Sequence, residues 1–187
     1  IGGGFPELYA RELEANAALR GAIRDAIDAG LPVYAECGGL MYLSRSIRSD
    51  GASWKMVGAI PADIVMRERP VGRGYVELEE TAAFPWPAAG EREAVVRAHE
   101  FHHAAVENLG PGLQFAYAVK RGHGIDGERD GIVIGNVLAS FAHLRSTRRN
   151  EWAARFVEFA RGCGHRQRHS RDWASSGTAR RHEAPII

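Results

Sequence analysis

Residues 32–43 of the chain have the sequence PVYAECGGLMYL. The apolar run at 32–36 predicts a short strand, and residues 40–43 begin a helix. Between them, Gly38 and Gly39 favour a sharp turn. A strand joined to a helix by a tight glycine turn is typical of α/β proteins. This stretch therefore predicts an α/β fold and places Cys37 at the turn.

Cys37 has the setting of a nucleophile elbow, in which a tight turn lifts the reactive side chain out of the fold. Small neighbours let a substrate approach closely, and the free N–H groups at the start of the next helix favour the thiolate. The alternative is a buried structural cysteine, the commoner state of an isolated cysteine in apolar surroundings. The local pattern alone leaves both open.

His143 follows an apolar stretch at residues 136–141 that predicts a strand. Catalytic side chains of α/β folds collect at strand ends, although a histidine at such a position is more often structural. A thiol nucleophile needs a base, and His143 supplies one. Considered together, Cys37 and His143 favour a catalytic site.

The rest of the chain supplies further strands and helices. Asn16 is an expected N-cap for a helix whose apolar stripe is Leu19, Ile23 and Ile27. A final helix is expected from about residue 150 to residue 160. Further strands are expected at residues 74–78, 94–98, 115–119 and 131–134.

The composition excludes several classes of protein. The 187 residues suit one domain, and 45% hydrophobic with 25% charged residues is typical of a globular protein. No stretch approaches the roughly 20 apolar residues of a spanning helix. Two cysteines cannot form a disulfide scaffold, and no phosphate-binding loop for ATP is present.

Charge is concentrated at the end of the chain. Residues 164–187 hold five arginines against two acidic residues, so the body at 1–163 is slightly acidic and carries no electrostatic footprint for nucleic acid. We expect the segment 164–187 to be a basic, poorly ordered tail. Binding of RNA or a metal by this tail is the less favoured alternative.

Four motifs carry a resemblance to a known family. They are residues 2–7 (GGGFPE), 35–43 (AECGGLMYL), 99–102 (HEFH) and 139–144 (ASFAHL). In order and spacing they resemble the glutamine amidotransferase domain of cobyrinate or hydrogenobyrinate a,c-diamide synthases, from residue 1 to about residue 161. The nine-residue motif at 35–43 is the most specific of them.

The resemblance implies a class I glutamine amidotransferase domain at residues 1–163. Its fold would be α/β, with a flavodoxin-like, mostly parallel sheet and an added antiparallel portion. Cys37 would be the nucleophile and His143 its base. Backbone N–H groups of Gly3, Gly4 and Gly38 would form the oxyanion hole. No metal site is implied.

The implied function is the glutaminase part of an ATP-dependent, glutamine-hydrolysing a,c-diamidation of cobyrinic or hydrogenobyrinic acid in cobalamin biosynthesis. Its partners would be glutamine, the corrin carboxylates and an N-terminal synthetase domain, which would bind ATP and Mg²⁺. The chain itself would need no cofactor, and a cytoplasmic location without membrane contact is expected. Alternatives are the cobyric acid synthase type, a related nickel tetrapyrrole amidotransferase, a thiol hydrolase of other amides, and a catalytically dead module.

Two departures from the family pattern stand out. Many class I domains have a glutamate two residues after the catalytic histidine, where this chain has Arg145. We therefore expect a Cys37–His143 dyad, as in the corrin-type subfamily. The family also has a strand, a helix and a strand before its glycine loop, so the sequence predicts a domain without its first strands and with weakened activity.

Other polar groups are assigned lesser roles. The spacing of His99, His102 and His103 would allow a shared metal ion, but Glu100 is the one acidic group nearby and the segment is predicted to be extended. The family resemblance implies a substrate-side or structural role for residues 99–102 instead. Residues 67–69 and 73–75 are expected to be solvated loops, with contact to the macrocycle or synthetase as the alternative. Cys163, at the end of the last helix, is expected to take no part in catalysis.

Overall fold

The computed structural model describes residues 1–87, 95–148 and 150–177. The helical elements are η1 (Pro6–Tyr9), α1 (Ala10–Ala15), α2 (Ala17–Asp28), α3 (Gly38–Leu43) and α4 (Trp152–Gly177). The strands are β1 (Val33–Glu36), β2 (Ser44–Ser49), β3 (Ala52–Lys55), β4 (Ile60–Met66), β5 (Gly72–Glu80), β6 (Val96–His102), β7 (Ala104–Glu107), β8 (Gln114–Arg121), β9 (Arg129–Ile134), β10 (Val137–Ser140) and β11 (His143–Leu144).

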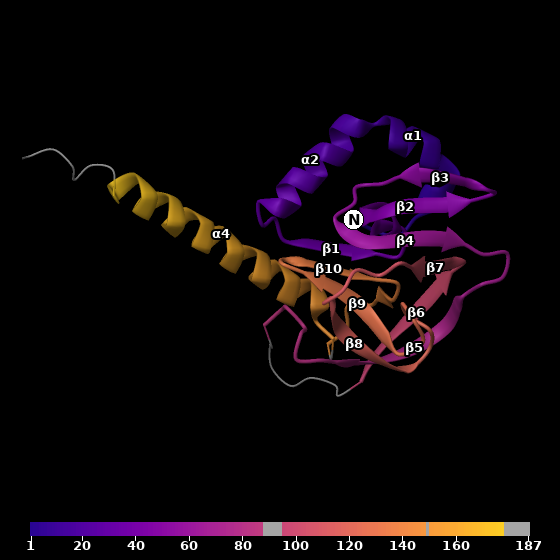
Figure 1. Ribbon diagram of the computed structural model, residues 1–187. Coiled ribbons are helices and arrows are strands. Elements are labelled where there is room, and N and C mark those ends of the chain that lie inside the picture. Colours follow the sequence, from indigo (N-terminus) through magenta and orange to yellow (C-terminus); the bar gives the residue numbers. More distant parts are fainter. Residues whose placement is uncertain (88–94, 149, 178–187) are drawn as a thin grey trace, which may run out of the picture.

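The strands form two sheets. The larger has the order β1-β10-β9-β8-β5-β6-β11, and the smaller has the order β3-β2-β4-β7. In Figure 1 the strands β2, β3 and β4 of the smaller sheet lie with α1 and α2 on one side of β1, and the strands β5, β6, β8 and β9 lie on the other. The α/β class expected from the sequence is confirmed.

Parallel pairing is less extensive than expected. It joins β1 to β10 and β2 to β4, whereas the other pairings between described strands are antiparallel. Short connections such as the one between β9 and β10 force neighbouring strands to run in opposite directions, because a parallel neighbour needs a long crossover. The antiparallel portion therefore dominates the larger sheet.

Strands β1 and β10 lie between two hydrophobic cores. Val33 and Ala35 belong to one core, with α3 and the smaller sheet, whereas Tyr34 packs on the opposite face. Leu138 of β10 also faces the second core, which the aromatic residues of α4 join. Burial on both faces explains why these strands are continuous apolar runs in the sequence.

Several local predictions are confirmed. The Asn16 side chain accepts a hydrogen bond from the N–H of Leu19 at 3.1 Å and caps α2, whose Ile23 and Ile27 pack against the core. The strands expected at residues 74–78, 115–119 and 131–134 correspond to β5, β8 and β9. The strand expected at 94–98 begins at Val96, and Ala94 lies outside the described residues.

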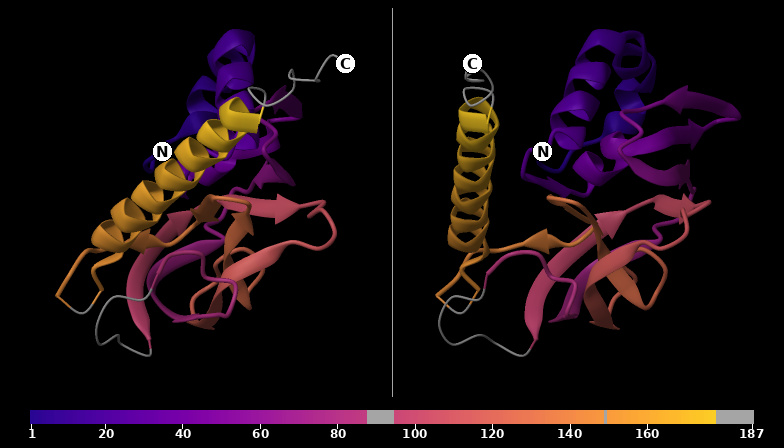
Figure 2. Two further views of the ribbon diagram at one scale, coloured as in Figure 1. Left: turned by 90° about the vertical axis from the view of Figure 1, so that its left-hand side faces the viewer. Right: turned by 60° about the vertical axis from the view of Figure 1, so that its left-hand side comes forward.

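Helix α4 is longer than expected. It continues from Trp152 to Gly177, well past residue 160, and extends away from the two sheets (Figure 2). Arginine, glutamine and alanine in this segment are good helix formers, and proline is absent until Pro185. Part of the expected tail is therefore helical, while residues 178–187 lie outside the described residues.

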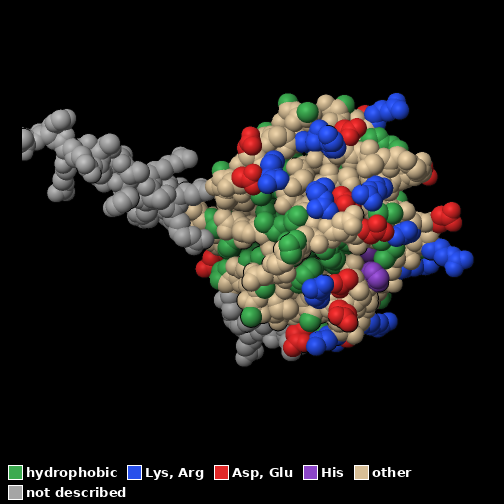
Figure 3. Space-filling model, viewed as in Figure 1, with side chains coloured by type: hydrophobic (Ala, Val, Ile, Leu, Met, Phe, Trp, Pro, Cys, Tyr) green, Lys and Arg blue, Asp and Glu red, His purple; other side chains and the backbone are tan. Residues whose placement is uncertain are grey.

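The surface shows no large area of one charge on the face in view. Basic and acidic side chains alternate there between apolar groups (Figure 3). Within the described ranges, no helix is both long and apolar enough to cross a membrane.

A buried carboxylate fixes the end of β10. Asp130 is fully buried and accepts hydrogen bonds from the Ser140 hydroxyl at 2.8 Å and from the N–H groups of Phe141 and Ala142 at 3.1 Å. Burial raises the pKa of Asp130, although these hydrogen bonds oppose that shift. The carboxylate thereby holds the turn that leads to His143.

We predict that Asp130→Ala lowers the free energy of unfolding by about 3 kcal/mol or more, because it leaves a hydroxyl and several N–H groups buried without an acceptor. Denaturant unfolding measures this change. The exposed Asp28, which pairs with Arg24 at 2.8 Å, provides the control. Asp28→Ala should cost less than about 1 kcal/mol. Equal effects of the two substitutions would contradict this role of Asp130.

Candidate active site

Cys37 occupies a strained turn between β1 and α3. Its φ of 48° and ψ of −105° lie outside the regions that side-chain-bearing residues usually adopt. The Cys37 N–H donates to the Ser140 carbonyl at 2.8 Å, so β10 holds the turn in place. Strain of this kind costs on the order of 1–3 kcal/mol and is concentrated at functional sites. The elbow geometry expected from the sequence is confirmed.

The three glycines assigned to the oxyanion hole lie next to this turn. A Cβ atom on Gly38 would come within 2.3 Å of the Gly4 carbonyl oxygen, and one on Gly3 would come within 2.9 Å of His143 Cε1. Only residues without side chains allow these backbones and the imidazole to approach so closely. The fold therefore brings Gly3, Gly4 and Gly38 to the Cys37–His143 pair.

His143 has a carboxylate partner that the sequence analysis missed. Its Nδ1 lies 2.7 Å from Oε1 of Glu36, the residue directly before Cys37. The other Glu36 oxygen accepts from the Tyr34 hydroxyl at 2.9 Å and from the Leu144 N–H at 3.3 Å. Glu36 thus adds an acidic partner to the expected Cys37–His143 dyad. Arg145, two residues after His143, is exposed.

Strand register explains how Glu36 reaches His143. In the parallel pair, Glu36 lies beside Ser140, and the chain then turns to β11, where His143 pairs with His99 of β6. The two functional side chains are 107 positions apart in sequence. The only sequence signal was the acidic residue beside the nucleophile at the end of a buried strand.

The site is electrostatically organised around His143. The adjacent Cys37 sulfur, followed by the Glu36 carboxylate, raises the pKa of His143 to about 10. Burial raises the pKa of Glu36, but hydrogen bonds from His143 and Tyr34 outweigh burial and lower it. Because folding raises the His143 pKa from 6.5, protonation of His143 contributes its full stabilisation below pH 6.5 as long as Glu36 is ionised, and this contribution is lost as the pH rises through about 10.

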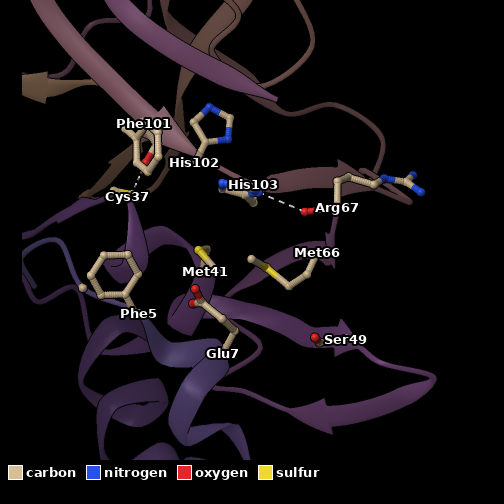
Figure 4. Close-up of a pocket in the computed structure, with 11 residues that line it drawn as sticks. Phe5, Glu7, Cys37, Met41, Ser49, Met66, Arg67, Phe101, His102 and His103 are labelled. Carbon is tan, nitrogen blue, oxygen red and sulfur yellow. Dashed lines mark hydrogen bonds between the residues drawn. The ribbon is translucent and has the colours of Figure 1, made fainter. Parts of the chain in front are cut away.

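A cavity of about 240 Å³ opens beside Cys37 (Figure 4). Its walls combine the glycine loop, α3, the ends of β2 and β4, and the end of β6. The lining residues are Gly4, Phe5, Glu7, Cys37, Met41, Ser49, Met66, Arg67, Phe101, His102 and His103. The Cys37 thiol faces this space and lies 3.9 Å from the Phe101 carbonyl oxygen. A small polar molecule with an aliphatic stem fits such a cavity.

The other histidines named in the sequence lie in different surroundings. Within the described residues, no group of three or more potential metal ligands is assembled. His102 is buried, stacks on Phe141 at 3.8 Å between ring centroids and lies 3.7 Å from the Glu100 carboxylate. His99 lies on the exposed face of β6, and its ring centroid is 6.0 Å from that of Tyr75 on β5. His102 and His103 also line the cavity beside Cys37, so the substrate-side or structural role expected from the sequence stays a prediction.

The remaining residues singled out in the sequence lie outside the turn at Cys37. Residues 67–69 are largely exposed, and Arg67 pairs with Glu107 at 2.6 Å. The stretch expected to be a loop at 73–75 is instead part of β5, because its residues pair with β6. Cys163 is buried in α4.

A cysteine at a strand–helix elbow, beside a histidine and a carboxylate, is an arrangement that α/β enzymes with a thiol nucleophile use. Residues 1–151 match the family described as the CobB/CobQ-like glutamine amidotransferase domain. The chain belongs to this family.

Curated relatives share this part of the chain. Cobyrinate a,c-diamide synthase of Magnetococcus marinus is 43% identical over 164 residues, which cover 88% of this chain and 34% of the relative. The synthases named likewise from Methanosarcina acetivorans and Archaeoglobus fulgidus are 41% and 42% identical, with 86% of this chain and 34% of each relative covered. The chain thus spans about a third of the length of these relatives.

Solved structures share the fold. A crystal structure of a glutamine amidotransferase has a TM-score of 0.60 at 18% identity, over 85% of this chain and 76% of the other. A putative GMP synthase protein from Thermoplasma acidophilum has a TM-score of 0.54 at 14% identity, over 91% of this chain and 74% of the other. The class I amidotransferase type of α/β fold is therefore confirmed.

We predict that Glu36→Gln lowers the pKa of His143 from about 10, because the amide accepts from Nδ1 without a negative charge. The pH titration of the His143 ring by NMR measures this shift. Glu158→Gln removes an exposed acidic residue of α4 and should leave the titration unchanged. An unaltered His143 titration in Glu36→Gln would show that Glu36 does not stabilise the imidazolium.

Proposed function

We propose that this domain hydrolyses L-glutamine at Cys37 and supplies the ammonia for an ATP-dependent a,c-diamidation of cobyrinic or hydrogenobyrinic acid in cobalamin biosynthesis. The hydrogen-bonded Glu36–His143 pair beside the Cys37 elbow is the observation that carries the proposal. The choice of a corrin carboxylate as the acceptor of the ammonia is supported by the names of relatives that are up to 43% identical to this chain.

In the first half of the reaction, the Cys37 thiolate attacks the side-chain carboxamide carbon of glutamine. Negative charge develops on the amide oxygen, where backbone N–H groups of Gly3, Gly4 and Gly38 would stabilise it. Because its raised pKa keeps His143 protonated, the imidazolium can donate a proton to the departing nitrogen. Ammonia leaves, and a γ-glutamyl thioester remains on Cys37.

In the second half, water attacks the thioester. His143, now neutral, accepts a proton from this water and keeps it, while the Cys37 sulfur leaves as a thiolate, so that the starting thiolate and imidazolium are restored. Glutamate is released. Glu36 acts through His143 as a positioning residue, since its hydrogen bond to Nδ1 orients the ring and leaves Nε2 for the reacting atoms.

Amide synthesis requires an activated carboxylate, which we assign to a synthetase portion outside this chain. The relatives are about three times as long as the matched segment, so they have room for a domain that binds ATP and Mg²⁺. Its partners would be the corrin carboxylates and the ammonia released here. A thiol must stay reduced to act as a nucleophile, and the cytoplasm favours the reduced state, so we propose a cytoplasmic location.

The test compares two nitrogen sources in the enzyme that contains both portions. Cys37→Ala should abolish glutamine-driven diamidation, and His143→Asn should slow it by about 10²–10⁴-fold, because both residues serve ammonia release. Both variants should retain diamidation driven by free ammonia. Chromatographic separation of the corrin products measures each activity.

His99→Asn is the matched control, because His99 pairs with His143 in the sheet, whereas the hydrogen bond to Glu36 comes from His143. It should retain most of the glutamine-driven activity. A larger loss in His99→Asn than in His143→Asn would refute the assignment of the base. Loss of the ammonia-driven activity in Cys37→Ala would show that Cys37 is structural, and no product from cobyrinate with either nitrogen source would refute the corrin acceptor.

A further inference from the structure

The cavity beside Cys37 contains a carboxylate that the proposed chemistry does not use. Glu7 lies at the start of the chain, in the short helix η1, and its side chain lines the cavity. Figure 4 shows the carboxylate directed toward Met41, in the space between Phe5 and Met66. Glu7 and Cys37 therefore border the same space.

One oxygen of this carboxylate has no partner. Glu7 Oε2 is buried, and no hydrogen-bond donor among the described residues contacts it. Burial raises the pKa of Glu7, while a backbone hydrogen bond and the nearby His103 act in the opposite direction. A buried oxygen without a donor is costly, so its retention at the wall of a cavity indicates that a ligand supplies the donor.

The basic groups nearby have other partners. The Arg67 guanidinium pairs with Glu107 at 2.6 Å, and Figure 4 shows its side chain leading away from Glu7. The His103 Nδ1 lies 3.1 Å from the Arg67 carbonyl oxygen. The part of the lining that Figure 4 shows around Glu7 consists of the apolar Phe5, Met41 and Met66 and of Ser49. The wall thus offers an acidic group at the end of an apolar passage.

We infer that Glu7 binds the α-ammonium group of the glutamine substrate, so that the domain selects a free α-amino acid rather than any primary amide. The inference rests on the proposed function. Glutamine has a carboxamide at one end, which must reach Cys37. Two methylene groups separate the carboxamide from the α-carbon, which bears the ammonium and carboxylate groups. Phe5 and Met41 would contact these methylene groups, while the ammonium donates to the unpartnered Glu7 oxygen.

Glutaramate, which is glutamine without its α-amino group, provides the discriminating probe. Wild-type protein should prefer glutamine to glutaramate in kcat/KM. Glu7→Gln should raise the KM for glutamine by about 10–100-fold, as expected for the loss of a charge-assisted hydrogen bond. Glutaramate hydrolysis should remain unchanged, so the preference for glutamine collapses. Release of the common product, ammonia, measures both reactions.

Glu12→Gln is the matched control, since Glu12 lies on α1 close in sequence but is exposed. It should leave both KM values unchanged. Thermal unfolding of Glu7→Gln checks that the fold is intact. If Glu7→Gln destabilises the fold, Glu7→Asp, which keeps the charge on a shorter side chain, should retain part of the preference. An undiminished preference for glutamine in Glu7→Gln, or equal losses with both amides, would overturn the inference.

Binding to Cys37→Ala separates this inference from the proposed function, because it requires no chemistry. By calorimetry, Cys37→Ala should bind glutamine more tightly than glutaramate, and the added Glu7→Gln substitution should remove the difference. A protein that binds glutamine through Glu7 but hydrolyses neither amide would refute the proposed function alone. Equal binding of glutamine with and without Glu7→Gln would refute this inference alone.

Discussion

The parallel pairing of β1 with β10 is the constraint on which the site depends. It aligns Glu36 with Ser140, and the Ser140 carbonyl accepts from the Cys37 N–H. Cys37 and the turn leading to His143 are therefore fixed by the same strand pair. Because β1 and β10 have buried side chains on both faces, a shift in this register would expose apolar groups as well as separate the functional ones.

Two buried or half-buried carboxylates stabilise the site in different ways. Asp130 accepts from backbone and hydroxyl donors in the turn after β10, so it determines where the chain lies. Glu36 accepts from the His143 ring, so it determines the orientation and charge of that ring. Asp130 thus fixes the backbone before His143, and Glu36 contacts the His143 side chain, so both carboxylates act on the same segment.

Local patterns allowed the elbow and the position of His143 to be predicted. The glycines around Cys37 and the apolar strands at residues 32–36 and 136–141 have short-range signatures. Glu36 was missed because its role depends on a residue 107 positions away, and no local pattern encodes that contact. The assignment of Cys37 as the nucleophile, which the local pattern together with His143 favours and the family resemblance implies, is still a proposal.

The smaller sheet was also missed. Strand β2 has the sequence SRSIRS, in which Ile47 is the one apolar residue, so its burial against β4 depends on tertiary contacts. The burial of the Glu7 oxygen similarly emerges only when η1 packs beside α3. In each case, the burial depends on contacts with residues that lie far away along the chain.

The central claim is that this strand pair assembles a thiol that forms a covalent intermediate with glutamine. Acid quenching of the protein during turnover, followed by peptide mass mapping, tests it most directly. The account predicts a γ-glutamyl thioester on Cys37 and none on Cys163. Ammonia release without an adduct on Cys37, or an adduct on Cys163, would contradict it.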